Sequence, residues 1–101
     1  MFERLHDNWL FREPPNTAVL SSIHIIREKR DILYVSHDMD DGAWQFHHGN
    51  NVALENAIIV SLATIVRFDS SIQILADLPL GWVASRKSRN SEWIRSKRNI
   101  Q

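Results

Sequence analysis

Short apolar runs separated by turn-forming residues are the main pattern of this chain. Runs of four or five β-prone residues bounded by Gly, Pro, Asn, Asp or Ser are typical of strands. Five stretches fit this description and are predicted as strands: Thr17–Leu20, Ile32–Val35, Ala43–Phe46, Ala57–Val60 and Trp82–Arg86. The run at Ala57–Val60 is apolar throughout, which favours a central strand that is buried on both faces.

Helical spacing of apolar residues appears in the segments between these strands. Ser21 or Ser22 is placed to cap a short helix over Ser22–Glu28, and Ser61 to cap a helix over Leu62–Phe68. Asp69 breaks this second helix, and a further turn is expected over Ile72–Asp77. The last residues predict one helical turn around Glu92–Lys97.

This order of elements predicts an α+β domain. We expect a mainly antiparallel sheet of four to five strands with short helices packed on one face. The 101 residues fit one domain, with an N-terminal arm at 1–16, a core at 17–86 and a basic tail at 87–101. The arm carries Phe2, Leu5, Trp9, Leu10 and Phe11 before Pro14-Pro15, and its large side chains are expected to pack on the core.

Composition limits the possible chemistry. Cysteine is absent, which excludes disulfides, thiolate metal sites and a cysteine nucleophile. The charged start and the lack of an apolar run of membrane length predict a cytoplasmic protein without a membrane partner. Gly42, Gly49 and Gly81 are the only glycines, so a phosphate-cradling loop is hard to build and no cofactor is expected.

Charge is distributed unevenly although the formal net charge is zero. Residues 1–85 hold six Lys/Arg and eleven Asp/Glu, whereas residues 86–101 hold six Lys/Arg and Glu92 alone. A basic tail of this kind indicates a contact with nucleic acid or with an acidic protein, or else a tail that folds back on the acidic body of its own or a neighbouring subunit or is simply solvated. We expect fold-back or simple solvation, which makes nucleic acid an unlikely partner.

The conspicuous polar chemistry gathers at the hairpin predicted around Asp38–Gly42. Six residues form this candidate site: His37, Asp38, Asp40, Asp41, His47 and His48. They supply the ligand types of a divalent metal site or an acid/base pair, but no metal-binding spacing is present. Strand alternation also separates His37 from Asp38, so a structural role or a protein-binding surface is preferred and no metal is expected.

Trp44 and Phe46 lie two residues apart and therefore share one face of their strand, while Gln45 and His47 share the other. The aromatic pair is expected in the core. The alternative is a stacking platform for single-stranded nucleic acid, which requires a basic groove beside it.

Several motifs together resemble a family of short bacterial proteins without an assigned activity. They are Trp9-x-Phe11, Pro14-Pro15-Asn16, Ile32–Asp38, Asp40–Phe46, Asp69–Ile72 and Leu75–Trp82. More distantly, they are similar to immunity proteins that neutralise toxins of neighbouring bacteria. The resemblance spans roughly residues 9–87 and implies a bacterial protein-binding module, without catalytic residues to carry over.

These observations favour a non-catalytic protein-interaction module, immunity-like or regulatory, with the acidic hairpin as its working surface. A homodimer through an exposed strand edge or the aromatic arm is a further expectation. The alternatives are a metal-dependent or acid/base enzyme that uses the hairpin cluster, and a nucleic-acid-binding protein that uses the tail.

Overall fold

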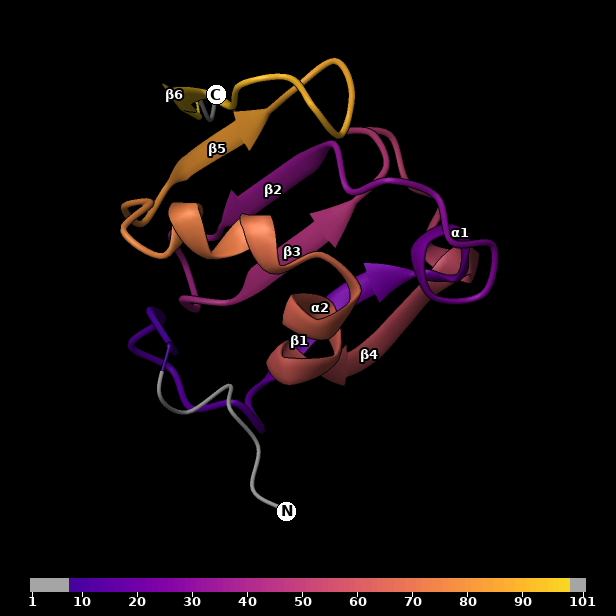
Figure 1. The fold of residues 1–101 in the computed structure, drawn as a ribbon, viewed down its shortest axis with the longest axis horizontal. Coiled ribbons are helices and arrows are strands. Elements are labelled where there is room, and N and C mark those ends of the chain that lie inside the picture. The colour runs from indigo at the N-terminus through magenta and orange to yellow at the C-terminus, as the bar shows by residue number, and fades with distance from the viewer. Residues whose placement is uncertain (1–7, 99–101) are drawn as a thin grey trace.

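The computed structural model describes residues 8–98 and places six strands in one sheet (Figure 1). The strands are β1 (Ala18–Ser22), β2 (Tyr34–His37), β3 (Trp44–His47), β4 (Ala57–Ser61), β5 (Trp82–Ser85) and β6 (Ile94–Lys97). Their order across the sheet is β4-β1-β3-β2-β5-β6. Every neighbouring pair is antiparallel except β1 and β3, which run parallel. The prediction of an α+β fold is confirmed in outline, although the sheet is mixed and has six strands.

Strand β4 is an edge strand, so its predicted central position is wrong. It pairs with β1 alone, and Ile59 in its middle is 63 % exposed. An unbroken apolar run fits a strand buried on both faces, but it also fits an edge strand that presents apolar side chains outward. The other side of β1 is occupied by β3, and no further strand lies beyond β4 among residues 8–98. This strand order, which the local sequence does not contain, decided between the two positions.

The tail adds a strand instead of the predicted helical turn. Ile94–Lys97 pairs antiparallel with β5, with Val83 opposite Ser96, so β5 is not the last strand. The backbone of Arg98 also donates to the carbonyl oxygen of Gly81 at 2.8 Å. The open edge of β5 supplied backbone partners that a short exposed helix lacks, and this outweighed local helix propensity.

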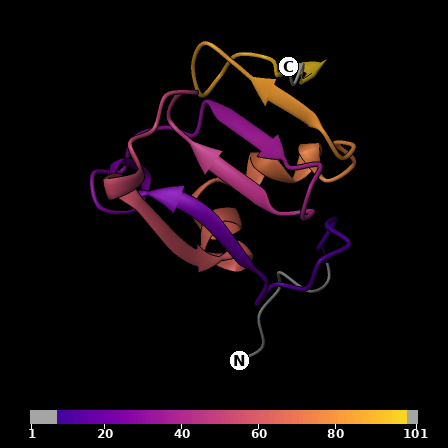
Figure 2. The same cartoon turned by 180° about the vertical axis from the view of Figure 1, so that it is seen from behind.

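Short helices link the strands. They are α1 (Ile23–Ile26), α2 (Leu62–Phe68) and the 3₁₀ helices η2 (Leu54–Asn56) and η3 (Ser70–Leu75). Figure 1 shows α2 and the orange helix η3 in front of the sheet, and Figure 2 shows both behind its strands. The helices of 62–75 thus cover one face, and among residues 8–98 no helix crosses the opposite face.

Local capping explains two of these helix starts. The hydroxyl of Ser61 accepts a hydrogen bond from the Thr64 amide at 3.1 Å, as predicted, and a carboxylate oxygen of Asp69 accepts one from the Ser71 amide at 3.1 Å. Ser22 precedes α1 at the expected position, but its side chain makes no capping bond. Its hydroxyl is buried without a hydrogen-bond partner.

The core lies between the sheet and the helices 62–75. Trp44 and Phe46 are 1 % and 0 % exposed, which confirms the prediction that this pair belongs to the core. Phe11 from the N-terminal arm is also buried and meets Trp44 edge-on, with 5.1 Å between ring centroids. Phe2 and Leu5 of the predicted arm lie outside the described residues. Among residues 8–98, no helix combines the length and apolar character needed to cross a membrane.

Two glycines set the turns at one end of the sheet. Gly42 has φ +73° and Gly81 has φ +83°, in the left-handed region that side chains rarely adopt. A Cβ at Gly81 would also lie 2.8 Å from the terminal carbon of Met39. These glycines close the β2–β3 hairpin and the entry into β5.

Candidate functional site: the open sheet face and its edges

The face of the sheet without helices carries a row of aligned side chains. Ile59 is opposite Leu20, Leu20 is level with Gln45, Gln45 is opposite Ser36, and Ser36 is opposite Val83. Paired residues of neighbouring strands point to the same side of a sheet. We call this side the open face (Figure 2). It is apolar near β4 and β5 and polar in the middle.

A hydrogen-bonded network occupies the middle of the open face. One carboxylate oxygen of Asp38 accepts from the Ser36 hydroxyl at 2.9 Å, and the other accepts from the Gln45 side-chain nitrogen at 2.7 Å. The guanidinium of Arg98 lies 3.8 Å from Asp38. The side-chain oxygen of Gln45 is 3.0 Å from Nε2 of His47. The network is therefore continuous from the tail through Asp38 to His47.

The network fixes which ring nitrogen of His47 carries the hydrogen. Because the amide nitrogen of Gln45 donates to Asp38, its oxygen faces His47, and Nε2 of the ring must carry the hydrogen. Nδ1 is then an acceptor, and it is buried without a partner. Burial lowers the pKa of His47 below 6.5, and the charge of Asp38 opposes this only in part. His47 is thus a neutral, shielded ring that braces the open face.

The structure distributes the six predicted site residues among separate places. Asp38 and His47 belong to the network above. His37 stacks on Trp44 at 4.0 Å on the other face and donates from Nδ1 to the Leu78 carbonyl at 2.7 Å. Asp40 and Asp41 are exposed in the turn, where Asp41 accepts from the Ala43 amide at 3.0 Å.

His48 lies beyond the end of β3, where its Nδ1 donates to the Asp31 carbonyl oxygen at 2.8 Å. Within the described residues, no group of three or more His, Asp or Glu side chains is arranged to hold a metal ion. Alternation contributes to this result, because it sends the neighbouring side chains of His37 and Asp38 to opposite faces of the sheet.

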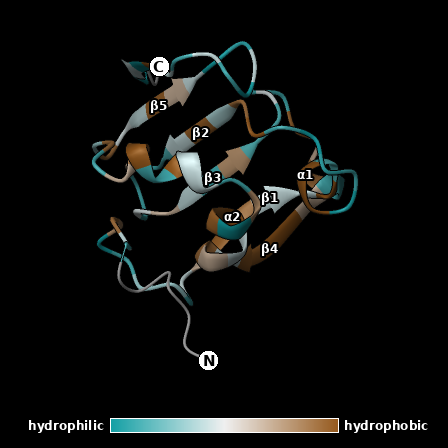
Figure 3. Cartoon of the chain, viewed as in Figure 1, coloured by the Kyte–Doolittle hydropathy of each residue, from teal (hydrophilic) through white to brown (hydrophobic). Residues whose placement is uncertain are grey.

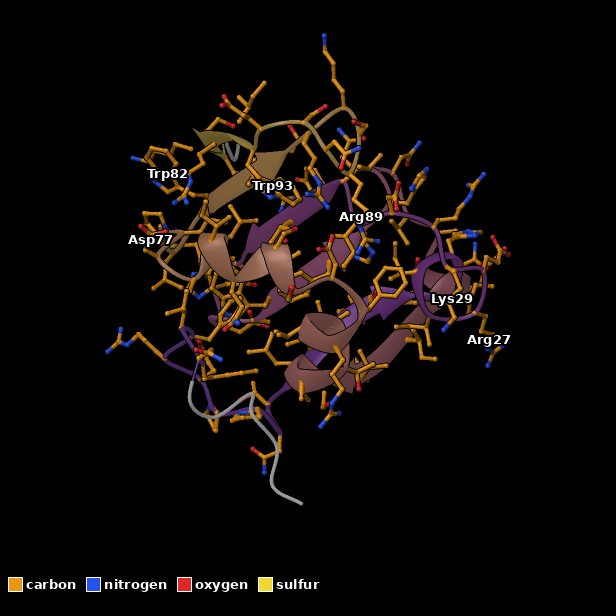
Figure 4. All side chains as sticks on the ribbon, in the orientation of Figure 1. Arg27, Lys29, Asp77, Trp82, Arg89 and Trp93 are labelled. Carbon is orange, nitrogen blue, oxygen red and sulfur yellow. The ribbon has the colours of Figure 1, made fainter. Side chains whose placement is uncertain are left out.

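The basic tail folds back on acidic residues of the same chain. Arg86 and Asp69 form a buried ion pair at 2.7 Å, and Arg95 pairs with Asp77 at 2.7 Å. Arg89 lies within 4 Å of both Asp31 and Asp69. In Figure 4, Arg89 lies beside η3 and Asp77 at the far end of that helix. The charge asymmetry of the sequence is therefore largely neutralised within the fold.

Trp93 holds the tail in place together with these pairs. The guanidinium of Arg86 lies 4.2 Å from the centre of the Trp93 ring, in cation–π contact. Trp93 also packs against the core from outside (Figure 4). The tail's aromatic and basic residues thus contact each other instead of forming a stacking platform beside a basic groove.

Strand β4 presents an unpaired edge. The Leu62 amide donates to the Thr17 carbonyl at 2.8 Å, and hydrogen-bonded pairs alternate along an antiparallel ladder. Every second residue of β4 before Leu62 therefore bonds to β1 through its backbone, which means Val60 and Ile58. The backbone N–H and C=O of Ile59, which lies between them, point away from β1. Figure 1 shows β4 at the margin of the sheet, and Figure 3 shows it coloured as apolar.

The two edges of the sheet differ in how they are protected. Natural edge strands commonly carry Lys, Pro or a bulge, which prevent pairing with other chains. β6 includes Arg95 and Lys97 and is exposed throughout. β4 has the sequence AIIVS, without charge or proline, and pairs with β1 over five consecutive residues without a bulge. The edge of β4 is therefore the one that is open to a further strand.

The sequence did not indicate Ile59 as a candidate contact residue, because the apolar run around it predicted a buried strand. The absence of any charged residue from this run is a signal of an unprotected edge, but it is informative only once the strand order is known. Comparison with known proteins adds no further candidate: no protein-family model, curated protein or solved structure matches this chain.

Proposed function

We propose that this protein is a protein-interaction module that recruits another chain at the edge of β4. The observation that carries the proposal is the unprotected edge, with the backbone N–H and C=O of Ile59 pointing outward and its side chain 63 % exposed. Adding a strand to such an edge satisfies backbone groups and buries apolar side chains at once.

A second copy of the chain is the partner best matched to this edge. Two β4 strands related by a two-fold axis at Ile59 exchange N–H···O=C bonds in both directions. The two Ile59 side chains then meet on the open face, where Leu20 lies beside each of them. β4 carries no charge that would repel its copy, whereas two β6 strands would bring Arg95 and Lys97 close to their counterparts.

The test compares two matched isoleucines. Ile59 and Ile94 are 63 % and 64 % exposed, point to the same face, and lie on opposite edge strands. We expect light scattering after gel filtration to show a concentration-dependent dimer for the wild type and for Ile94→Lys. Ile59→Lys is expected to remain monomeric, with thermal stability close to that of Ile94→Lys.

Two results would contradict this assignment. A wild-type monomer at millimolar concentration removes self-association at β4. Equal dimerisation of both variants places the contact elsewhere on the surface.

The resemblance to immunity proteins extends the proposal to a second class of partner, a bacterial toxin. The exposed carboxylates of Asp40 and Asp41 would then face a basic surface and increase the association rate more than the affinity. Capture of a candidate toxin by the wild type, compared with the variant that carries Asp40→Asn and Asp41→Asn, tests this role. Undiminished capture removes the turn from the proposal.

A further inference from the structure

A polar hollow lies where α1 meets the connection from β3 to β4, away from the centre of the open face. It has a volume of about 320 Å³ and lies between the end of β1, the segment after α1 and residues 48–56. In Figure 4 the labelled Arg27 and Lys29 lie beside α1, on the connection that follows it. The hollow is large enough for a small organic anion, at the low end of ligand-site volumes.

The lining is basic and amide-rich. Arg30, His24 and His48 line it together with Asn50, Asn51 and Asn56. None of its lining residues is acidic, although Glu28 accepts a hydrogen bond from His24 at 3.0 Å nearby. The side chain of Arg30 makes no hydrogen bond or ion pair with any residue of 8–98, although it attracts the carboxylate of Glu28 at longer range. Its guanidinium therefore retains all five donors for a ligand.

His48 is oriented for the same role. Its Nδ1 donates to the Asp31 carbonyl oxygen at 2.8 Å, which fixes the ring and leaves Nε2 as the free nitrogen. A carbonyl oxygen can only accept, so Nδ1 keeps its hydrogen. Nε2 is thus the ring nitrogen that has no bonding partner among residues 8–98.

An unsatisfied hydroxyl provides an independent indication of a ligand. Ser22 lines the hollow and is 1 % exposed, yet its Oγ has no hydrogen-bond partner. Buried hydroxyl groups in folded proteins are almost always hydrogen-bonded. Ser22 also makes no capping bond to α1. Ser22 is thus a lining residue with a buried hydroxyl that has no partner among residues 8–98.

We propose that this hollow binds a small oxyanion, carried by a phosphate or a carboxylate compound. Arg30 supplies the fixed charge, the asparagine amides donate to the ligand oxygens, and His48 and Ser22 line the hollow with polar atoms that have no other partner among residues 8–98. The chemistry resembles other oxyanion sites, in which guanidinium and amide donors converge on acceptor oxygens. This site is independent of the β4 edge and adds a ligand to the proposed protein contact.

The test is an NMR titration of the ¹⁵N-labelled protein with inorganic phosphate, and separately with succinate, against sodium chloride at equal ionic strength. We expect saturable shifts of the Asn51 and Asn56 side-chain amides and of the His48 ring. Stronger shifts with phosphate or with succinate identify which source of the oxyanion the site prefers. The sodium chloride series is expected to cause no saturable change.

Two arginines provide the matched comparison. Arg27 is exposed on the same connection but does not line the hollow. Arg30→Gln is expected to weaken binding by about tenfold or more, whereas Arg27→Gln leaves it unchanged, because loss of one charge-assisted hydrogen bond has an effect of this order. Ser22→Ala is expected to weaken binding less. Shifts that do not saturate, or that are equal in the two arginine variants, overturn the proposal.

Discussion

The buried ion pair between Asp69 and Arg86 gives the sharpest test of how the tail is held. Both side chains are 2 % exposed, and their charged atoms are 2.7 Å apart. Arg86 also donates to the Ile32 and Arg89 carbonyl oxygens at 3.0 Å each. Asp69→Asn keeps an oxygen to cap η3 but leaves the charge of Arg86 buried without its counterion.

We expect Asp69→Asn to lower the free energy of unfolding by about 3–5 kcal/mol, the usual cost of removing one partner of a buried pair. A domain of this size is stable by about 5–15 kcal/mol, so the variant should be close to the folding limit. Urea unfolding followed by tryptophan fluorescence measures the loss. The expected loss comes from the burial of an unpaired charge and not from the short distance between the charged atoms.

The Asp77–Arg95 pair is the control for that distinction. Its charged atoms are also 2.7 Å apart, but the Asp77 side chain is 80 % exposed. We expect Asp77→Asn to have a much smaller effect, because water already solvates and screens this pair. Equal losses in the two variants would refute the argument from burial. Recovery of stability by Asp69→Leu combined with Arg86→Met would support it.

Acid unfolding tests the same carboxylate. Burial raises the pKa of Asp69, but hydrogen bonds from Ser71 and Arg86 outweigh it, so the pKa lies below 3.8. Its contribution to stability is therefore present above the unfolded pKa and is lost as the pH falls through the folded pKa. We expect the stability of Asp69→Asn to depend less steeply on pH below about 4 than that of the wild type. Parallel curves would contradict this linkage.

Three further predictions follow from local contacts. Ser61→Ala should destabilise the protein by about 1 kcal/mol through loss of the α2 cap, whereas Ser22→Ala should cost less; equal losses in urea unfolding would contradict the capping assignment. Because burial lowers the pKa of His47, wild-type stability should fall as the pH drops below 6.5, and this fall should be smaller in His47→Gln; identical pH profiles would remove His47 as the cause. Trp93→Ala should destabilise the protein by loss of the Arg86 contact and apolar burial, and unchanged thermal unfolding would show that the tail is only loosely attached.

Local signals in the sequence correctly predicted those elements that are set by residues a few positions apart in the chain. The hairpin around Asp38–Gly42, the Ser61 cap and the span Leu62–Phe68 were all predicted and are present. Alternation placed Trp44 and Phe46 together in the core and separated His37 from Asp38. Each of these features depends on spacing along one strand or one helix.

The candidate site depended on contacts that no local pattern specifies. Asp38 and His47 are joined by Gln45, and Asp38 also approaches Arg98, which is sixty residues away in the chain. The other predicted site residues do not join this network. They are His37, Asp40, Asp41 and His48. Composition identified the polar groups, whereas sheet pairing decided which of them meet.

The sequence by itself therefore determined the α+β class, the hairpin, the Ser61 helix cap and the aromatic core of this protein. The tertiary structure alone decided that β4 is an edge, that 94–97 forms a strand, and which acidic residues the basic tail contacts. The physical reason is that strand order and ion pairing join residues far apart in the chain. The free energy of such a contact depends on which strand edges and charged groups remain unpaired once the other elements have packed. A short stretch of sequence does not contain this information.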